Sequence, residues 1–359
     1  MRTKCAFVFS LLGMWFGVNA AFGQYSQYIE AVDEYCPAPG QFTNVIPTYA
    51  DGDTPETMAS KCTEAIGGDV FKNEDSYEIT LGGWGGYVVF HFDHPVANVK
   101  GQRDFAVWGN AFTNSASDWT VVSAEPAIVM VSVDENGNGL PDDEWYELAG
   151  SEYNNPQTIH HYEVSYEYAP LQDVRWTDNQ GNEGTIDRNR WHMQEYFPLW
   201  LKEKGKLTFS GARLPDNAYL QGITFILPAY DWGYADNHCN WTDVSKETLN
   251  AEGCGLDIGW AVDADGQPVE LSHIDFVKCY NAMNQKCGDI GETSTEIAGA
   301  EDLHLEASVE ATAIRTVGNS TTVSQRCYSL DGRMLAQPQR GLNIVRTADG
   351  KTRKVINQK

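Results

Sequence analysis

The sequence predicts an all-β protein: a jelly-roll-like two-sheet sandwich with long loops, followed by a small C-terminal β module. Turn residues separate short segments that alternate apolar and polar residues or run apolar at strand length, and no long stretch shows helical periodicity. Such strands are typical of sandwiches, and 359 residues are ample to bury a core. The expected strands of the body are 77–81, 86–92, 104–108, 127–133, 162–168, 207–209, 223–227 and 273–278.

Residues 1–23 have the layout of a secretory signal peptide. Arg2 and Lys4 precede an apolar run over 5–18, and small residues follow at 19–21. We expect this segment to be removed on export. No other apolar run approaches the length of a membrane span, so the mature protein is expected to be secreted or held at the outer cell surface.

Four parts are expected after the signal peptide. An N-terminal segment covers 24–60, where four prolines interrupt any long element. The sandwich covers 61–298. Residues 299–322 mix Ala, Glu, Ser and Thr without periodicity, which predicts a linker. The C-terminal β module covers 323–359.

Residues 134–144 carry oxygen side chains at alternate positions, with glycines between them. Calcium prefers six to eight oxygen ligands, and loops of the EF-hand kind supply them at this spacing. We therefore expect a structural calcium ion. Position 12 is Trp145 and not a bidentate Glu, so this is no true EF-hand, and an ordinary Asn-Gly hairpin turn is the alternative. The expected ligands are Asp134, Asn136, Asn138, the carbonyl of Leu140, Asp142 and Asp143.

Two further acidic turns, at 178–187 and 263–270, show a weaker form of the same alternation. Each could hold a metal ion in principle. Plain Asx turns, in which an aspartate accepts hydrogen bonds from the following backbone, are the more frequent structure for such sequences.

Seven cysteines remain after signal removal, an odd number for an oxidising compartment. The expected disulfides join sequence neighbours, and Cys327 is left over. A zinc site is the weaker alternative, because the spacings are irregular and no Cys-x-x-Cys occurs. The expected pairs are Cys36 with Cys62, Cys239 with Cys254, and Cys279 with Cys287.

The charge pattern excludes one class of partner. The chain has 50 acidic and 25 basic residues, and basic residues outnumber acidic ones by nine to two from Ile314 to Lys359, so the body is strongly acidic. An acidic body repels nucleic acid. It suits a calcium-binding exterior protein.

Aromatic residues are numerous and many stand beside turns. Exposed rings stack on apolar sugar faces, while nearby polar groups orient the ligand, so a carbohydrate site is expected. The alternative is that these rings fill the core. The expected ligand-binding residues are Trp145, Tyr146, Trp176, Tyr230, Trp232 and Tyr234.

Catalytic signatures are weak, so no catalytic residue is predicted. Neither Gly-x-Ser-x-Gly nor His-Glu-x-x-His is present, although two carboxylates could serve glycoside hydrolysis. His160 and His161 could suggest a metal site, but adjacent residues of a regular strand point to opposite faces.

Several motifs of the body, spread over roughly 75–298, together resemble uncharacterised cell-surface proteins of Bacteroidota, some of them described as PKD-like. The resemblance implies a surface location and assigns no activity. Some members accompany outer-membrane nutrient receptors, which implies such a receptor as a partner and a sugar or a corrinoid as a captured nutrient. The motifs lie at 82–90, 104–112, 125–133, 143–153, 176–179, 230–236 and 276–278.

The tail shows short expected strands separated by Asp-Gly and Arg-Gly turns, at 328–335, 337–346 and 349–356. It resembles the C-terminal sorting domain of proteins exported by the type IX secretion system. This resemblance implies delivery to the cell surface or beyond, and a tail that can be removed in transit. A plain C-terminal β module is the alternative.

These observations favour a secreted or cell-surface, calcium-stabilised protein that binds extracellular carbohydrate through aromatic loops. A glycan-acting hydrolase and a capture protein for a small nutrient such as a corrinoid are the alternatives. A protein that binds nucleic acid is not expected.

Overall fold

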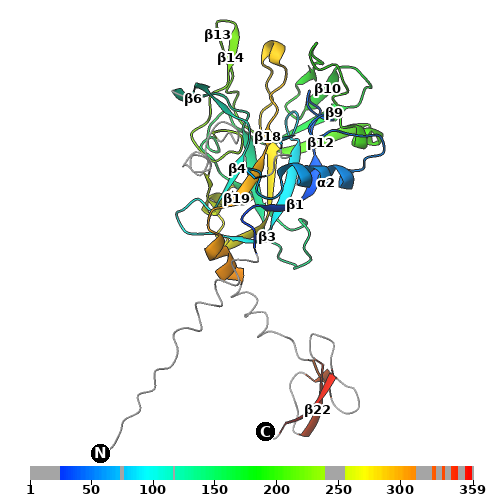
Figure 1. Cartoon of the computed structure of the whole chain (residues 1–359), viewed down its shortest axis with the longest axis vertical. Coiled ribbons are helices and arrows are strands. Elements are labelled where there is room, and N and C mark those ends of the chain that lie inside the picture. The colour runs from blue at the N-terminus through cyan, green and yellow to red at the C-terminus, as the bar shows by residue number, and fades with distance from the viewer. Residues whose placement is uncertain are drawn as a thin grey trace, which may run out of the picture. The chain divides into compact units, whose positions relative to one another are not determined.

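The computed structural model describes residues 25–72, 77–115, 118–238 and 255–312, and the backbone of four strands between residues 326 and 357 (Figure 1). The chain divides into two compact units, Met1–Val309 and Glu310–Lys359. The expected signal peptide lies outside the described residues. No described helix is both long and apolar enough to cross a membrane.

The first unit is an all-β sandwich, as predicted, and all the strand pairs of its main sheet are antiparallel. Most neighbours in this sheet are distant in sequence, whereas β7 and β8 are consecutive strands. Its six strands, in spatial order, are β1 (Ile29–Cys36), β3 (Tyr87–Ala97), β17 (His273–Asn281), β7 (Ala127–Ser132), β8 (Trp145–Leu148) and β16 (Ala261–Val262).

Two smaller sheets complete the layers. One has four strands in the order β11 (Glu183–Ile186), β10 (Val174–Asp178), β9 (Ile159–Glu167) and β12 (Lys206–Arg213). The other has three strands in the order β15 (Gly255–Leu256), β4 (Phe105–Trp108) and β19 (Gly299–Asp302).

Within the described residues, three two-stranded ribbons and three short 3-10 helices occupy the connections. The ribbons are β2 (Ile79–Thr80) with β18 (Glu296–Ile297), β5 (Phe112–Ser115) with β6 (Asp118–Ser123), and β13 (Tyr219–Gln221) with β14 (Thr224–Ile226). The 3-10 helices are η1 (Leu199–Lys204), η2 (Ile258–Trp260) and η3 (Gly288–Ile290).

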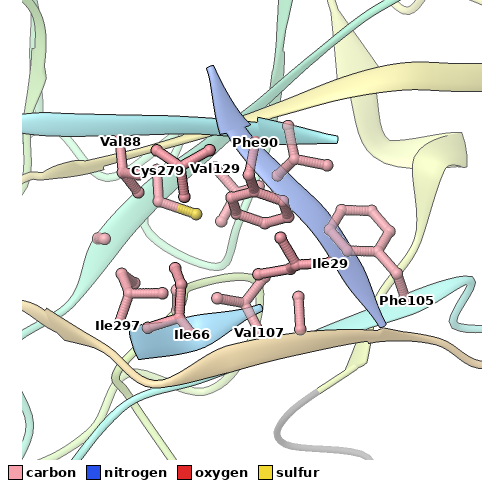
Figure 2. Close-up of a cluster of buried hydrophobic side chains, with 14 of the residues drawn as sticks. Ile29, Ile66, Val88, Phe90, Phe105, Val107, Val129, Cys279 and Ile297 are labelled. Carbon is pink, nitrogen blue, oxygen red and sulfur yellow. The ribbon is translucent and has the colours of Figure 1, made fainter. Parts of the chain in front are cut away.

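The main core lies on one face of the six-stranded sheet (Figure 2). Phe90 of β3 and Val129 of β7 point toward Val107 of β4 and Ile66 of a helix, and all four side chains are essentially inaccessible to solvent. Burying one such side chain contributes roughly 1.5–3 kcal/mol relative to leaving it exposed. The alternating strand pattern of the sequence is thus the pattern that fills this core.

Helix α2 (Pro55–Ile66) was not expected. Pro55 occupies its first turn, where a proline ring suits the backbone and removes no hydrogen bond of the helix. The Thr54 side chain accepts a hydrogen bond from the Thr57 amide, and the Thr57 side chain accepts one from the Thr54 amide. The prolines that suggested an interrupted segment therefore include one that starts a helix.

Both ends of the predicted sandwich extend further than expected. Strand β1 pairs with β3, so the segment 24–60 belongs to the body. Strand β19 pairs with β4, and residues 305–312 are helical, so 299–312 form no linker. The mixed composition of both segments, without apolar alternation, did not predict their strands. Each segment is ordered by pairing with a distant strand or by packing.

The expected disulfides that fall on described residues are not formed. Cys36, Cys62, Cys279 and Cys287 are free thiols. Cys62 and Cys279 pack in the apolar core, where a thiol behaves as a small apolar side chain, and burial raises their pKa. The pairings of Cys36 with Cys62 and Cys279 with Cys287 are therefore wrong, because proximity in sequence did not place these sulfur atoms together. The pair Cys239 with Cys254 lies outside the described residues.

The C-terminal unit contains the small antiparallel β module that the sequence predicts. Its four strands follow the order β21 (Met334–Leu335), β20 (Arg326–Tyr328), β22 (Gly341–Arg346) and β23 (Thr352–Asn357). Cys327 lies on β20.

Candidate ligand-binding cleft

A cavity of about 740 Å³ lies where strands of the six-stranded and four-stranded sheets meet two turns. We call it the Trp145 cleft. Its volume is within the range of small-molecule sites. The lining includes Met130, Trp145, Glu147, Tyr153, His160, His161, Glu163, Asn179, Ser210, Asp263, Asp265 and Gly266.

Strand β8 divides its side chains between the cleft and the core. Trp145 and Glu147 line the cleft, whereas Tyr146 and Leu148 are buried in the main core. This division follows from the two-residue period of a strand. Met130 of β7 is the register partner of Glu147, so both lie on the face that forms the cleft.

Glu147 is the most perturbed acid of the cleft. Its carboxyl group has no hydrogen-bond partner or ion pair among the described residues, and burial raises its pKa to about 7. A carboxyl group titrating there can donate a proton near neutral pH or accept one. Tyr153 has its pKa raised by burial, with a further contribution from the negative charge of Glu147.

His160 and His161 both line the cleft, contrary to the expectation that they would point to opposite faces. Their strand contains a β-bulge: Gly211 pairs with Tyr162, while Arg213 pairs with Ile159, so two residues of β9 face one residue of β12. The backbone of His161 has φ +54°, which breaks the regular alternation.

Asn179 supports this bulge. Its side-chain amide donates to the His161 carbonyl at 2.7 Å, and its backbone amide donates to the Glu163 carbonyl at 3.0 Å. The turn after β10 therefore stabilises the irregular part of β9. It also brings Asn179 itself to the cleft.

Both weaker acidic turns are Asx turns. Asp178 accepts hydrogen bonds from the amides of Gln180 and Asn182, and Asp263 accepts them from Asp265 and Gln267. These hydrogen bonds fix the turns. Because both turns contribute residues to the cleft, their role in the structure is to shape its edge.

The 134–143 loop closes on itself. Asp134 accepts hydrogen bonds from the amides of Gly137, Asn138 and Gly139 at 2.8–3.0 Å. The side-chain amides of Asn136 and Asn138 donate to Asp142 at 3.0–3.1 Å. Four of the expected ligand side chains, with Asp143 near Asn136, therefore converge in one exposed loop. The Asp134 oxygens accept backbone amides here and the side-chain nitrogens of Asn136 and Asn138 face Asp142, as in an ordinary turn, so the calcium ion stays a prediction.

Among the expected ligand-binding aromatics, Trp145 alone lines this cleft. Tyr146 and Tyr234 are buried, with exposed fractions of 8% and 3%, because each packs in a core cluster. Tyr230 is half-buried against Tyr234, at a ring separation of 5.6 Å. Tyr146 and Tyr234 therefore serve packing in this structure.

The other two aromatics lie in different surroundings. Trp176 lines a smaller cavity and packs closely on Gly184. The ring of Trp232 lies 4.5 Å from that of Trp260. The structure thus does not assemble the six aromatic residues into one site.

The residues that the sequence did not single out for this cleft are mainly Glu147, Tyr153, the two histidines and Glu163. Trp145 and Glu147 are two residues apart on one strand and so share a face, and this spacing could have predicted Glu147 as a cleft residue. The bulge that turns both histidines to the cleft depends on pairing with β12, which sequence spacing does not reveal.

No family model matches the chain, and no curated protein matches it. The resemblances to Bacteroidota surface proteins and to a sorting domain remain predictions. The functional interpretation therefore rests on the residues of the cleft.

Proposed function

We propose that the protein is a secreted or cell-surface, calcium-stabilised protein that binds carbohydrate in the Trp145 cleft. The observation that supports this most is the combination of aromatic rings and oxygen acceptors in one cavity. Trp145 and Tyr153 offer apolar planes for sugar rings. The carboxylates of Glu147, Glu163 and Asp263 can accept hydrogen bonds from sugar hydroxyl groups.

The charges of the cleft narrow the ligand class. Neither Lys nor Arg is among the described residues that line it, whereas four acidic residues are. A sulfated or phosphorylated glycan would meet repulsion and no charged partner. A neutral sugar or an amino sugar is therefore the proposed ligand.

Calcium in the 134–143 loop would act through the strand that follows. The Ser132 hydroxyl donates to the Glu144 carbonyl at 2.8 Å, which ties the end of β7 to the start of β8. Asp275 accepts a hydrogen bond from the Asp134 amide at 2.8 Å. A bound ion would rigidify the connection that positions Trp145, so we propose a structural role for it.

Location and partners are part of the same proposal. The signal-peptide pattern and the sorting-domain resemblance of the tail support export, and an outer-membrane receptor is the proposed protein partner for a captured sugar. Export can be tested by locating the protein in cell fractions with an antibody.

A glycan array tests the binding proposal. Wild-type protein should bind neutral or amino-sugar glycans, and Trp145→Ala should lose at least 10-fold in affinity because the ring that stacks on the sugar is gone. Trp191→Ala is the matched control, because Trp191 is 70% exposed and lines a different cavity. Absence of binding to every glycan would refute the proposal.

One observation favours a glycan hydrolase as the second candidate. Glu147, with a pKa of about 7, shares the cleft with Glu163, and glycoside hydrolysis uses one protonated and one ionised carboxyl group. Release of reducing sugar by the wild type, abolished in Glu147→Gln while glycan binding persists, would establish hydrolysis. No release from any bound glycan would leave the protein as a binding protein.

A further inference from the structure

A second group of acids lies outside the Trp145 cleft. Glu125 follows β6, Asp236 follows the β13–β14 ribbon, and Glu296 begins β18. One carboxylate oxygen from each of the three lies within 4.8 Å of the others. We call these residues the Glu125 cluster. Among the described residues, no other set of His, Cys, Asp and Glu side chains meets this criterion.

The fold holds these carboxylates firmly in place. Asp236 accepts hydrogen bonds from the amides of Asn110 and Ala111, both at 2.8 Å, and from the Glu296 amide at 3.1 Å. Hydrogen bonds from backbone amides favour the ionised form of a carboxylate. Burial nevertheless raises the pKa of Asp236 to about 7, so the three amides orient the carboxyl group and only partly offset the cost of burying its charge.

Glu296 and Glu125 are also oriented by donors. Glu296 accepts hydrogen bonds from the hydroxyls of Thr80 and Ser294 at 3.1 and 3.2 Å. The Ser294 amide donates to Glu125 at 3.1 Å. The second oxygen of Glu125 accepts no hydrogen bond from the described residues, so it remains available to a ligand.

The charge of the cluster is not balanced by the protein. No Lys, Arg or His of the described chain forms an ion pair with its three members, and Asp236 and Glu296 are 0% and 3% exposed. Burial, with a contribution from the neighbouring carboxylates, raises the pKa of Glu125 and Glu296 well above the usual range. Buried carboxylates in proteins are normally paired or coordinate a metal ion.

Glu292 supplies an independent observation. It is 8% exposed, and it lines the same cavity of about 620 Å³ as Glu125 and Ser294. One of its oxygens accepts a hydrogen bond from the Gln41 amide at 2.5 Å, but the other, Oε2, is buried without a partner. A buried oxygen without a donor is costly, and a hydrated cation in the cavity would satisfy it.

We propose that the Glu125 cluster binds a calcium ion at the inner end of this cavity, with water bridging the ion to Glu292. The three ligands are hard oxygens and no nitrogen or sulfur donor accompanies them, which disfavours zinc. Two oxygens on opposite sides of a calcium ion stand up to about 5 Å apart, since each bond is 2.3–2.6 Å long. The separations in the cluster lie within this limit, and the cavity leaves room for the waters that complete the coordination.

The test counts calcium bound to the mature chain by equilibrium dialysis with radioactive calcium at about 1 mM, a range typical of extracellular calcium modules. The double variant Asp134→Asn/Asp142→Asn removes ligands of the exposed loop without touching the cluster. It should still bind one equivalent. If it binds none, the cluster is not a calcium site, whatever the wild type binds.

Two further variants in that background locate the remaining ion. Adding Glu125→Gln should abolish binding of the remaining calcium ion, because the amide keeps the shape of the side chain but not its charge. Adding Glu195→Gln is the matched control: Glu195 is a buried glutamate that also accepts a backbone amide, and its loss should leave the equivalent bound. Equal calcium binding by the two triple variants would overturn the proposal.

Discussion

The rings of Tyr153 and His160 lie 4.8 Å apart, and the Nε2 of His160 lies 3.0 Å from the Tyr153 carbonyl oxygen. This contact joins the loop after β8 to the bulged start of β9, and both residues line the Trp145 cleft. The turn at Gly266 packs on Tyr153, because a Cβ at position 266 would lie 2.9 Å from the Tyr153 hydroxyl oxygen.

Gly266→Ala should therefore weaken ligand binding. Gly266 has φ +74°, so the substitution strains the backbone and also displaces Tyr153. We expect a loss of about 1–2 kcal/mol in the free energy of unfolding. Calorimetric titration with a bound glycan should show an affinity at least 10-fold lower. Gly181→Ala is the control, because Gly181 has φ +85° but nothing within 4 Å of its Cβ position. Equal affinities of the two variants would contradict the role of the Tyr153 contact.

Glu147→Gln should change the pH dependence of stability. The pKa of Glu147 is about 7 in the folded chain, above its ordinary value of 4.5. The folded state therefore binds the proton more tightly than the unfolded state. The resulting contribution to the free energy of unfolding is complete below pH 4.5 and is lost as pH rises through 7. The variant should thus gain about 2 kcal/mol in the free energy of unfolding relative to wild type between pH 5 and pH 8. Urea unfolding at both values measures this. A constant difference between the two proteins would show that the carboxyl group is not perturbed.

Phe90→Ala should destabilise the sandwich by about 3–5 kcal/mol, because the ring is fully buried where the sheet meets β4 and α2. Chemical denaturation followed by tryptophan fluorescence gives the value. Ile223→Ala should cost no more than about 0.5 kcal/mol, since Ile223 is 99% exposed. A loss below about 1 kcal/mol for Phe90→Ala would place the core elsewhere.

Calcium in the exposed loop should raise the melting temperature. An ion that binds only the folded chain stabilises it by mass action. Asp134→Asn/Asp142→Asn should reduce the calcium-induced shift, whereas Asp263→Asn should not, because Asp263 belongs to a different turn and is no ligand of the 134–143 loop. Differential scanning fluorimetry with calcium or chelator compares the three proteins. An unchanged calcium-induced shift of the melting temperature in the double variant would show that the loop is an ordinary turn without calcium.

The sequence predicted the strands well, because alternation at Val88, Phe90 and Phe92 is a local property that burial on one face requires. Helix α2 was missed because four prolines dominated the segment, although the capping pattern of Thr54 and Thr57 was present. The disulfide prediction failed for the described pairs because it assumed that neighbours in sequence meet in space.

The sites were less predictable than the fold. Trp145 could be selected from its position after an acidic loop, but its partners in the cleft come from turns and from a bulge that forms only on pairing. The Glu125 cluster joins Asp236 to Glu296, which are 60 positions apart. Two of its members lie in motifs, 125–133 and 230–236, that attracted attention for other reasons. Long-range convergence of this kind is set by the topology and leaves no local pattern.

The central claim is that carbohydrate binds in the Trp145 cleft. Its most direct test is calorimetric titration of one array-identified oligosaccharide into wild type, Trp145→Ala and Trp191→Ala, with folding confirmed by circular dichroism. We predict one binding site in wild type, the same affinity in Trp191→Ala, and at least 10-fold weaker binding in Trp145→Ala, equivalent to about 1.4 kcal/mol. Equal affinity of Trp145→Ala and wild type would contradict the claim.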